Sequence, residues 1–238
     1  MSQRVLAVLA VGCLVSSSQA ALFSFASDND HTSWTFTGAG ASVRDAQDPL
    51  DPQILLVDDH NGPLPAIPFA VEFQADFTIS YLASVALGGG SFVHNYALNG
   101  TFSFLDALGN TLLSATVSNG ALTALGGQTS WYSTATLQAN DNANGGSVVY
   151  TWNGAAIPGY DLLPGNSQGQ DDMSFTLTAL NGAGASGVQL DRTSFLPSGE
   201  WTSEGSYSGT GRNFIPAPGA AMIAALGGLV ALRRRRSN

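Results

Sequence analysis

Residues 71–80 read Val-Glu-Phe-Gln-Ala-Asp-Phe-Thr-Ile-Ser, and this stretch decides the fold class. Apolar residues hold the odd-numbered positions and polar residues hold the even-numbered ones. Because successive side chains of a β-strand point to opposite faces, this period of two predicts a strand that is buried on one face only. The odd-numbered phase continues from Tyr81 to Leu87 and stops at the three glycines of residues 88–90. We therefore expect a strand that is either long or bent near its middle.

The rest of the chain between residues 21 and 213 repeats this alternation. Further alternating runs begin at Phe92, Phe102, Leu113, Trp131, Val148 and Met173. Asn-Gly pairs suit tight turns, and Asn99-Gly100 predicts the clearest hairpin. We interpret residues 43–68 and 153–171 as long connections, and no stretch shows a capped 3.6-residue period. The sequence predicts an all-β domain: an antiparallel two-sheet sandwich of the jelly-roll type, with a closed barrel as the alternative.

The first 20 residues have the layout of a secretory signal. Arg4 stands in a short basic start, an apolar stretch runs from Val5 to Val15, and small residues precede the end at Ala20. This layout predicts a signal helix that is cleaved after Ala20. Lipidation of Cys13, the only cysteine, is the alternative, but the apolar stretch before it is short for that purpose.

The last 25 residues form a second targeting segment. They hold a proline-containing motif at Pro216, Ala217, Pro218 and Gly219, an apolar run to Leu232, and a basic cluster at Arg233, Arg234, Arg235 and Arg236. Extended back to Phe214, the apolar run reaches about the 20 residues that a membrane span needs. Four arginines would stay on the cytoplasmic side. We expect a hydrophobic helix that stops in the membrane and leaves the upstream chain exported.

This ending resembles the PEP-CTERM sorting signals of bacterial envelope proteins, in the variant with Pro-Ala-Pro-Gly-Ala-Ala at the motif. Ala217 stands where the family's glutamate would be. The resemblance implies recognition by an exosortase, a membrane-embedded transpeptidase-like enzyme that removes the tail. Residues 102–114 also look like the sandwich bodies found upstream of such signals. That likeness implies a sandwich fold and a position upstream of the sorting signal, but it assigns no functional site.

Four segments follow from these patterns: a signal peptide at 1–20, a β-sandwich domain at 21–205, a Gly- and Ser-rich linker at 206–213 and the sorting segment at 214–238. All eight basic residues are arginines, and five of them lie in the two targeting segments. The body therefore has three arginines against 17 carboxylates, a formal net charge of −14. Such a charge excludes nucleic acid and anionic lipid surfaces as partners, and favours cations or neutral polymers.

Two glycine motifs and one histidine are candidates for chemistry. Gly165-Asn-Ser-Gln-Gly169 matches the nucleophile elbow with Ser167 at its centre, but a strand follows it where the elbow needs a helix. Residues 182–187 match the dinucleotide-binding pattern, and again a strand follows. Both are interpreted as loops. His94 is in phase with the neighbouring aromatic residues, which predicts a structural histidine facing the core.

Calcium and sugars are the remaining ligands to consider. The hard oxygen ligands that calcium prefers occur in three clusters: Asp28, Asp30 and His31; Asp58, Asp59 and His60; Asn140, Asn142, Asn144 and Gly145. Solvated loops and turns explain all three better, so no metal site is predicted. Four tryptophans could stack on sugars if exposed: Trp34, Trp131, Trp152 and Trp201. The alternation places Trp131 and Trp152 in the core.

The sequence therefore predicts a non-catalytic exported protein of the cell envelope or extracellular matrix, anchored to the membrane at least transiently. The alternative is a carbohydrate-binding module for surface polysaccharide. A hydrolase is the third hypothesis, and it requires Ser167 or a pair of carboxylates beside a histidine.

Overall fold

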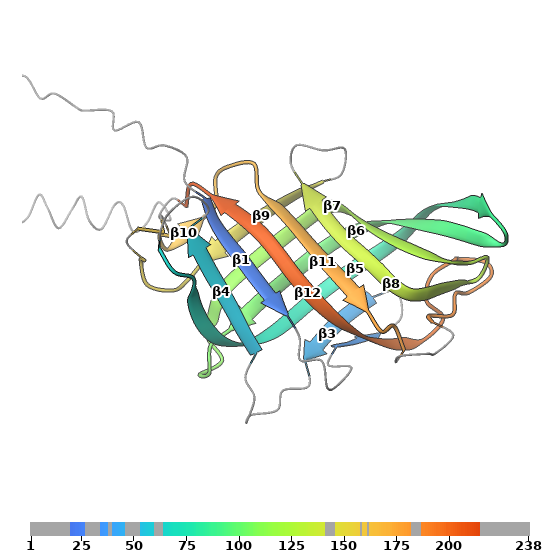
Figure 1. Cartoon of the computed structure of the whole chain (residues 1–238), viewed down its shortest axis with the longest axis horizontal. Coiled ribbons are helices and arrows are strands. Elements are labelled where there is room, and N and C mark those ends of the chain that lie inside the picture. The colour runs from blue at the N-terminus through green and yellow to red at the C-terminus, as the bar shows by residue number, and fades with distance from the viewer. Residues whose placement is uncertain are drawn as a thin grey trace, which may run out of the picture.

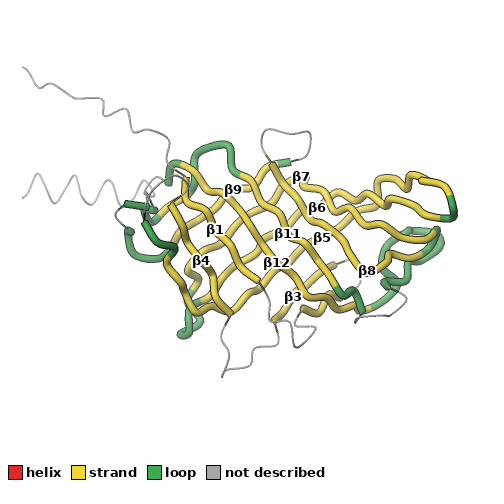
Figure 2. The backbone as a smooth tube through the Cα atoms, viewed as in Figure 1, coloured by secondary structure: helices red, strands yellow, loops and turns green. Residues whose placement is uncertain are grey.

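A computed structural model of the chain describes residues 20–26, 34–37, 40–45, 53–59, 64–140, 146–157, 159–160, 162–181 and 187–214. Within these residues all regular structure is β-strand (Figure 2), and every strand pairing is antiparallel. The all-β antiparallel prediction is confirmed. The two expected terminal helices, the sorting motif and the arginine cluster lie outside the described residues.

The described residues form twelve strands. In chain order these are β1 Ala20–Ala26, β2 Trp34–Thr37, β3 Gly40–Asp45, β4 Gln53–Asp59, β5 Ile67–Gly88, β6 Ser91–Leu105, β7 Thr111–Gly127, β8 Ser130–Asn140, β9 Ser147–Trp152, β10 Gly165–Asn166, β11 Asp172–Thr178 and β12 Glu200–Arg212. The expected connection over residues 43–68 is partly wrong, because its apolar run forms β4 between β1 and β5.

Pairing joins all twelve strands into one sheet that closes on itself. Hydrogen bonds run from β5 through β6, β7, β8 and β11 to β12, and return to β5 through β2 and β3. A second return runs through β1 and β4, beside the other half of β12. The expected division into two separate sheets is not shown. In Figure 1 the wall of β4, β1, β12, β11 and β8 crosses in front of β5, β6 and β7.

Strand β5 changes face near its middle. The odd-numbered residues from Val71 to Ile79 are buried, as predicted. Tyr81 then pairs with Tyr96 and Ala83 with Asn95, the next residue of β6, so Leu82 is an extra residue in the ladder. A bulge of this kind reverses the alternation. Beyond it the odd-numbered residues lie on the outer face, which corrects the prediction of one continuous phase to Leu87.

The prediction of a hairpin at Asn99-Gly100 is wrong. These residues lie inside β6, where Asn99 faces a bulge in β7 made by Ser118 and Asn119, and Asn119 N donates to Asn99 Oδ1 over 2.8 Å. A β-carbon at Gly100 would overlap the carbonyl oxygen of Asp76 on β5. The pair is thus required by a close approach inside the sheet. The β6–β7 turn is made instead by residues 106–110, where the Asp106 carboxylate accepts from the backbone of the turn.

Residues 206–213 are not the linker that their composition suggested. Ser206–Arg212 continue β12 and pair with β1 on one side, while β11 pairs on the other. Three of the inward positions of this strand, Gly205, Gly209 and Gly211, are glycines because large rings lie over them. A β-carbon at Gly205 would overlap the Trp34 ring, and one at Gly209 would overlap the hydroxyl oxygens of two tyrosines.

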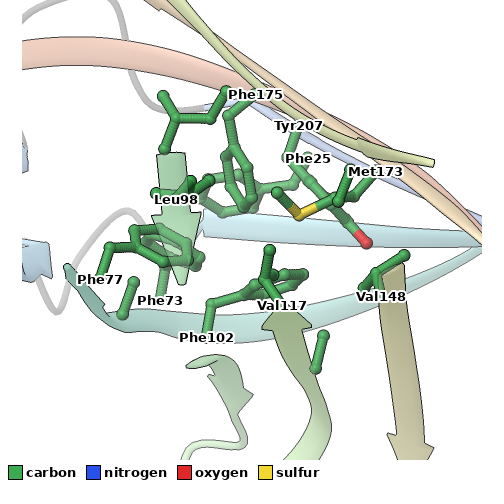
Figure 3. Packing of buried hydrophobic residues seen from close by; sticks show 14 of the residues in the cluster. Phe25, Phe73, Phe77, Leu98, Phe102, Val117, Val148, Met173, Phe175 and Tyr207 are labelled. Atoms are coloured by element: carbon green, nitrogen blue, oxygen red, sulfur yellow. The ribbon is translucent and has the colours of Figure 1, made fainter. Parts of the chain in front are cut away.

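The core fills the space between the front wall, made of β4, β1, β12, β11 and β8, and the rear wall, made of β5, β6 and β7. Phe73 and Phe102 from the rear wall meet Phe175 and Tyr207 from the front wall (Figure 3), with ring centroids 4.7 Å apart for Phe175 and Tyr207 and 5.1 Å for Phe102 and Phe175. Aromatic rings at these separations add packing energy to the burial of their area. Burial and sheet pairing hold this domain together.

Candidate functional site

Two clusters of buried polar groups interrupt the apolar core, one at each end of the closed sheet. The end at which β1 begins and β12 ends is here called the proximal end, and the end that carries the β5–β6 turn is the distal end (Figure 1). The proximal cluster, called the seam cluster, comprises Tyr150, Ser167, Asp171 and Tyr207. The distal cluster comprises Tyr81, Ser84, His94 and the carbonyl of Gly127.

The seam cluster ties the segment after β10 to the last residues of β12. Ser167 lies almost fully buried, and its hydroxyl donates to Asp171 Oδ2 while it accepts from Tyr150 N over 2.8 Å. Asp171 is 1% exposed, and its Oδ1 accepts from Arg212 N over 2.9 Å. Gln168 N donates to the Arg212 carbonyl over 2.8 Å. A buried carboxylate is tolerated because these hydrogen bonds satisfy it.

Two tyrosines extend the cluster into the core. Tyr207 Oη donates to Tyr150 Oη over 2.9 Å, and Tyr150 Oη donates to the Asp172 carbonyl over 2.7 Å. Burial raises the pKa of Tyr150 well above its ordinary value, and the nearby Tyr207 adds to this rise. Burial likewise raises the pKa of Tyr207, with the hydrogen bond to Tyr150 opposing it. Both phenols are therefore neutral donors at physiological pH.

This geometry gives Ser167 a structural role. Its hydroxyl proton is committed to Asp171, and the chain after it continues into strand β11, so the strand-to-helix turn of a nucleophile elbow is not formed. His94, the histidine in the described part of the chain, bonds to other groups. The hydrolase hypothesis in its Ser167 form therefore finds no imidazole partner among the described residues.

The distal cluster is a directed chain of hydrogen bonds across β5, β6 and β7. Tyr81 Oη donates to Ser84 Oγ over 3.0 Å, and Ser84 Oγ lies 2.7 Å from His94 Nδ1. His94 Nε2 lies 2.7 Å from the carbonyl oxygen of Gly127. A carbonyl can only accept, so Nε2 is the donor to Gly127, and in that tautomer Nδ1 is left to accept from the Ser84 hydroxyl. The prediction that His94 faces the core is confirmed, because its side chain is fully buried.

A serine that donates to an imidazole is also the arrangement of an activated nucleophile. Ser84 is half-buried and could meet a reagent, whereas the His94 ring is covered by the ring of Phe92, with centroids 6.2 Å apart. No pattern in the sequence indicates this pair. The two residues face each other only because the bulge at Leu82 turns Ser84 to the inner face.

The tryptophans lie where they cannot stack on a sugar. All four are between 0% and 2% exposed. Trp201 stacks on Phe36 with ring centroids 3.7 Å apart, and Trp131 donates from Nε1 to Tyr96 Oη over 3.0 Å. The core prediction for Trp131 and Trp152 is confirmed, and it extends to the other two.

The metal candidates are mostly outside the described residues. Asp28, Asp30, His31, His60, Asn142, Asn144 and Gly145 lie there, together with residues 182–186 of the second glycine motif and the side chain of Asp59. Asp58 is half-buried on β4. Among described side chains no group of three His, Cys, Asp or Glu residues is placed to hold a metal ion. The calcium hypothesis stays untested.

Comparison with protein families, with curated proteins and with solved structures returned no match for this chain. Across the described ranges no helix is long and apolar enough to cross a membrane.

Proposed function

We propose that this protein is a non-catalytic exported protein of the cell envelope or extracellular matrix, delivered by residues 1–20 and sorted by residues 214–238. In this proposal the tail engages a processing enzyme of the exosortase type through Pro216–Gly219, and Arg233–Arg236 stop transfer. The proposal includes no cofactor and no nucleic-acid partner, and calcium is its one alternative ligand.

The observation that supports the proposal most is the position of the domain's two ends. Ala21, the first residue after the proposed cleavage point, pairs with Gly211, so the segments on either side of the domain attach at the same end of the closed sheet. Phe214 is buried against Phe23, with ring centroids 6.2 Å apart, so the folded domain includes the residue at which the sorting segment begins. A domain attached at one end leaves its opposite end free to face outward.

Fractionation of cells that produce the full chain tests this proposal. We expect the protein in the envelope or the medium, with mature ends after Ala20 and near Gly219 by mass spectrometry. Replacing the four arginines at 233–236 by serine should change the distribution between these fractions. The matched control is Arg192→Ser in the body, which should change nothing. Recovery of the unprocessed chain in the cytosol contradicts the proposal.

The non-catalytic part of the proposal has its own test. A fluorophosphonate probe should leave the full chain unlabelled, because the Ser167 hydroxyl is committed to Asp171 and the His94 ring beside Ser84 is fully buried. Labelling that disappears in Ser84→Ala and persists in Ser167→Ala would establish the hydrolase alternative at the distal cluster. The carbohydrate-binding alternative receives no support from the tryptophans, since all four are buried.

A further inference from the structure

An uncharged apolar face lies on the outside of the distal end. Val85 of β5 pairs with Val93 of β6, and Val93 pairs with Leu125 of β7, so their side chains form one row across three strands. Tyr132 of β8 continues this row, with its hydroxyl 3.4 Å from Ser91 Oγ. Val85 is 53% exposed, Leu125 41% and Tyr132 43%. These four apolar residues are here called the distal face.

The bulge in β5 creates this face. Before Leu82, the odd-numbered residues of the strand point into the core, where Ile79 is 5% exposed. After the bulge the same apolar phase continues in the sequence but points to solvent. The sequence thus places β-branched apolar side chains where an exposed strand would ordinarily carry polar ones.

Charge singles out the same region. From residue 77 to residue 140 the chain has one charged residue, Asp106, at the β6–β7 turn. The remaining 16 carboxylates lie in the other parts of the sequence. Two copies of so acidic a protein repel each other. Their repulsion is least where the uncharged strands of one copy meet the uncharged strands of the other.

We propose that the distal face is the interface of a homodimer of this chain. Its exposed side chains present on the order of 300 Å², at the lower end of the range for the largest apolar patch of a typical monomer, which is often functional. Small uncharged residues around the row, Ala83, Asn95 and Thr123, extend it toward the roughly 800 Å² that each partner gives to a standard interface. A dimer with an interface of this size is reversible.

The chemistry of the face fits a second copy better than other occupants. A flat row without charge is complementary to itself, as a two-fold interface requires. Anionic lipid would be repelled by the acidic body, and a sugar would find one exposed ring, that of Tyr132. The face also lies at the end of the sheet opposite to the β1–β12 pair, so segments attached there leave it accessible (Figure 1).

Sedimentation velocity of the full chain over a range of concentrations tests the dimer. We expect reversible dimerisation, weakened about tenfold or more by Val85→Glu and by Leu125→Glu, because each places a like charge on both copies in the interface. Mixing Leu125→Glu with Leu125→Lys should restore association. The matched control is Val149→Glu, on β9 at 42% exposure and away from the face, which should dimerise as the parent does. Circular dichroism should be the same for all variants.

Three results would overturn the dimer. One is a monomer at every concentration. Another is an oligomer that Val85→Glu leaves unchanged, including one lost only when residues 216–238 are removed, which assigns association to the tail. The last is a monomer whose flotation with neutral phosphatidylcholine vesicles depends on Val85, which assigns the face to lipid. None of these bears on export, so the localisation proposal stands or falls separately.

Discussion

Deleting Leu82 from the middle of the 22-residue strand β5 should leave the fold intact. Tyr81 and Ala83 pair with consecutive residues of β6, so removing the residue between them yields a regular ladder. Every later pair is preserved: Ser84 still faces His94, and Val85 still points outward. An ordinary strand offers no such position, because a deletion there turns all later side chains to the other face.

The cost of this deletion follows from exposure. Leu82 is 62% exposed, so its loss removes only about a third of a leucine's burial, roughly 0.5–1 kcal/mol. A ladder hydrogen bond gained in its place contributes about 0.5–1.5 kcal/mol. The two terms oppose each other, and the free energy of unfolding should change by less than about 1 kcal/mol. Urea titration followed by tryptophan fluorescence measures it, since all four tryptophans are buried in the folded state.

Deleting Ser80 is the matched control. It moves Tyr81 to the outer face and brings Leu82 opposite Tyr96. Tyr81 then loses its stacking on Phe195, at 4.9 Å between centroids, and its hydrogen bond to Ser84. We expect the free energy of unfolding to fall by about 2–4 kcal/mol, in the range of disrupted core packing together with a broken, partly buried hydrogen bond. If both deletions cost the same, Leu82 is not an extra residue and the origin of the distal face is wrong.

Three further predictions concern the buried polar groups, and urea titration checks each. Asp171→Ala should lower the free energy of unfolding by about 3–5 kcal/mol, because it leaves Ser167 Oγ and the Arg212 backbone N–H unpaired in the seam cluster. Asp171→Asn keeps one acceptor and should lower it by less; equal losses would contradict this prediction. Tyr150→Phe should lower the free energy of unfolding by about 1 kcal/mol or more beyond the loss in Tyr207→Phe, because Tyr150 is both an acceptor and a donor while Tyr207 donates. A larger loss in Tyr207→Phe would contradict these hydrogen-bond directions. Burial raises the pKa of Tyr96 to about 12 and that of the other two phenols as well. Above about pH 10 the unfolded chain loses phenolic protons that the folded chain keeps, so stability should fall as pH rises, by up to about 1.4 kcal/mol per pH unit for each phenol; a flat profile from pH 10 to 12 would refute it.

The fold class could be predicted because alternation is a local property of strands. Residues 71–79 show it on their own, and the structure buries the predicted face. The errors come from residues whose conformation depends on a distant strand. Asn99-Gly100 has the composition of a turn, but β5 and β7 pair on both sides of it and keep it inside strand β6. The Gly-rich end of β12 has the composition of a linker until Trp34 and Tyr150 are packed over it.

The seam cluster and the distal cluster could not be predicted from the sequence for the same reason. Ser167 stood out in the sequence through a motif that the structure does not use, and its partner Asp171 carried no signal beyond its spacing. The Ser84–His94 pair needs the register of β5 against β6, which no pattern within either strand reveals. The alternation within one strand predicts the face on which each side chain lies, whereas contacts between side chains of two strands depend on the register in which those strands pair.

The position of β12 sets the order in which this protein can fold. This last strand pairs with β11, with β2 over one half and with β1 over the other, and Ala20 meets Arg212 across nearly the whole length of the domain. Contacts between such distant residues slow folding, because a large loop must close before they form. A chain that emerges from its amino end therefore keeps β1 and β2 without their final partner until residue 212 has emerged. The closed sheet is completed only when residue 212 is available, and on the export route proposed above the chain would therefore cross a narrow pore before it folds.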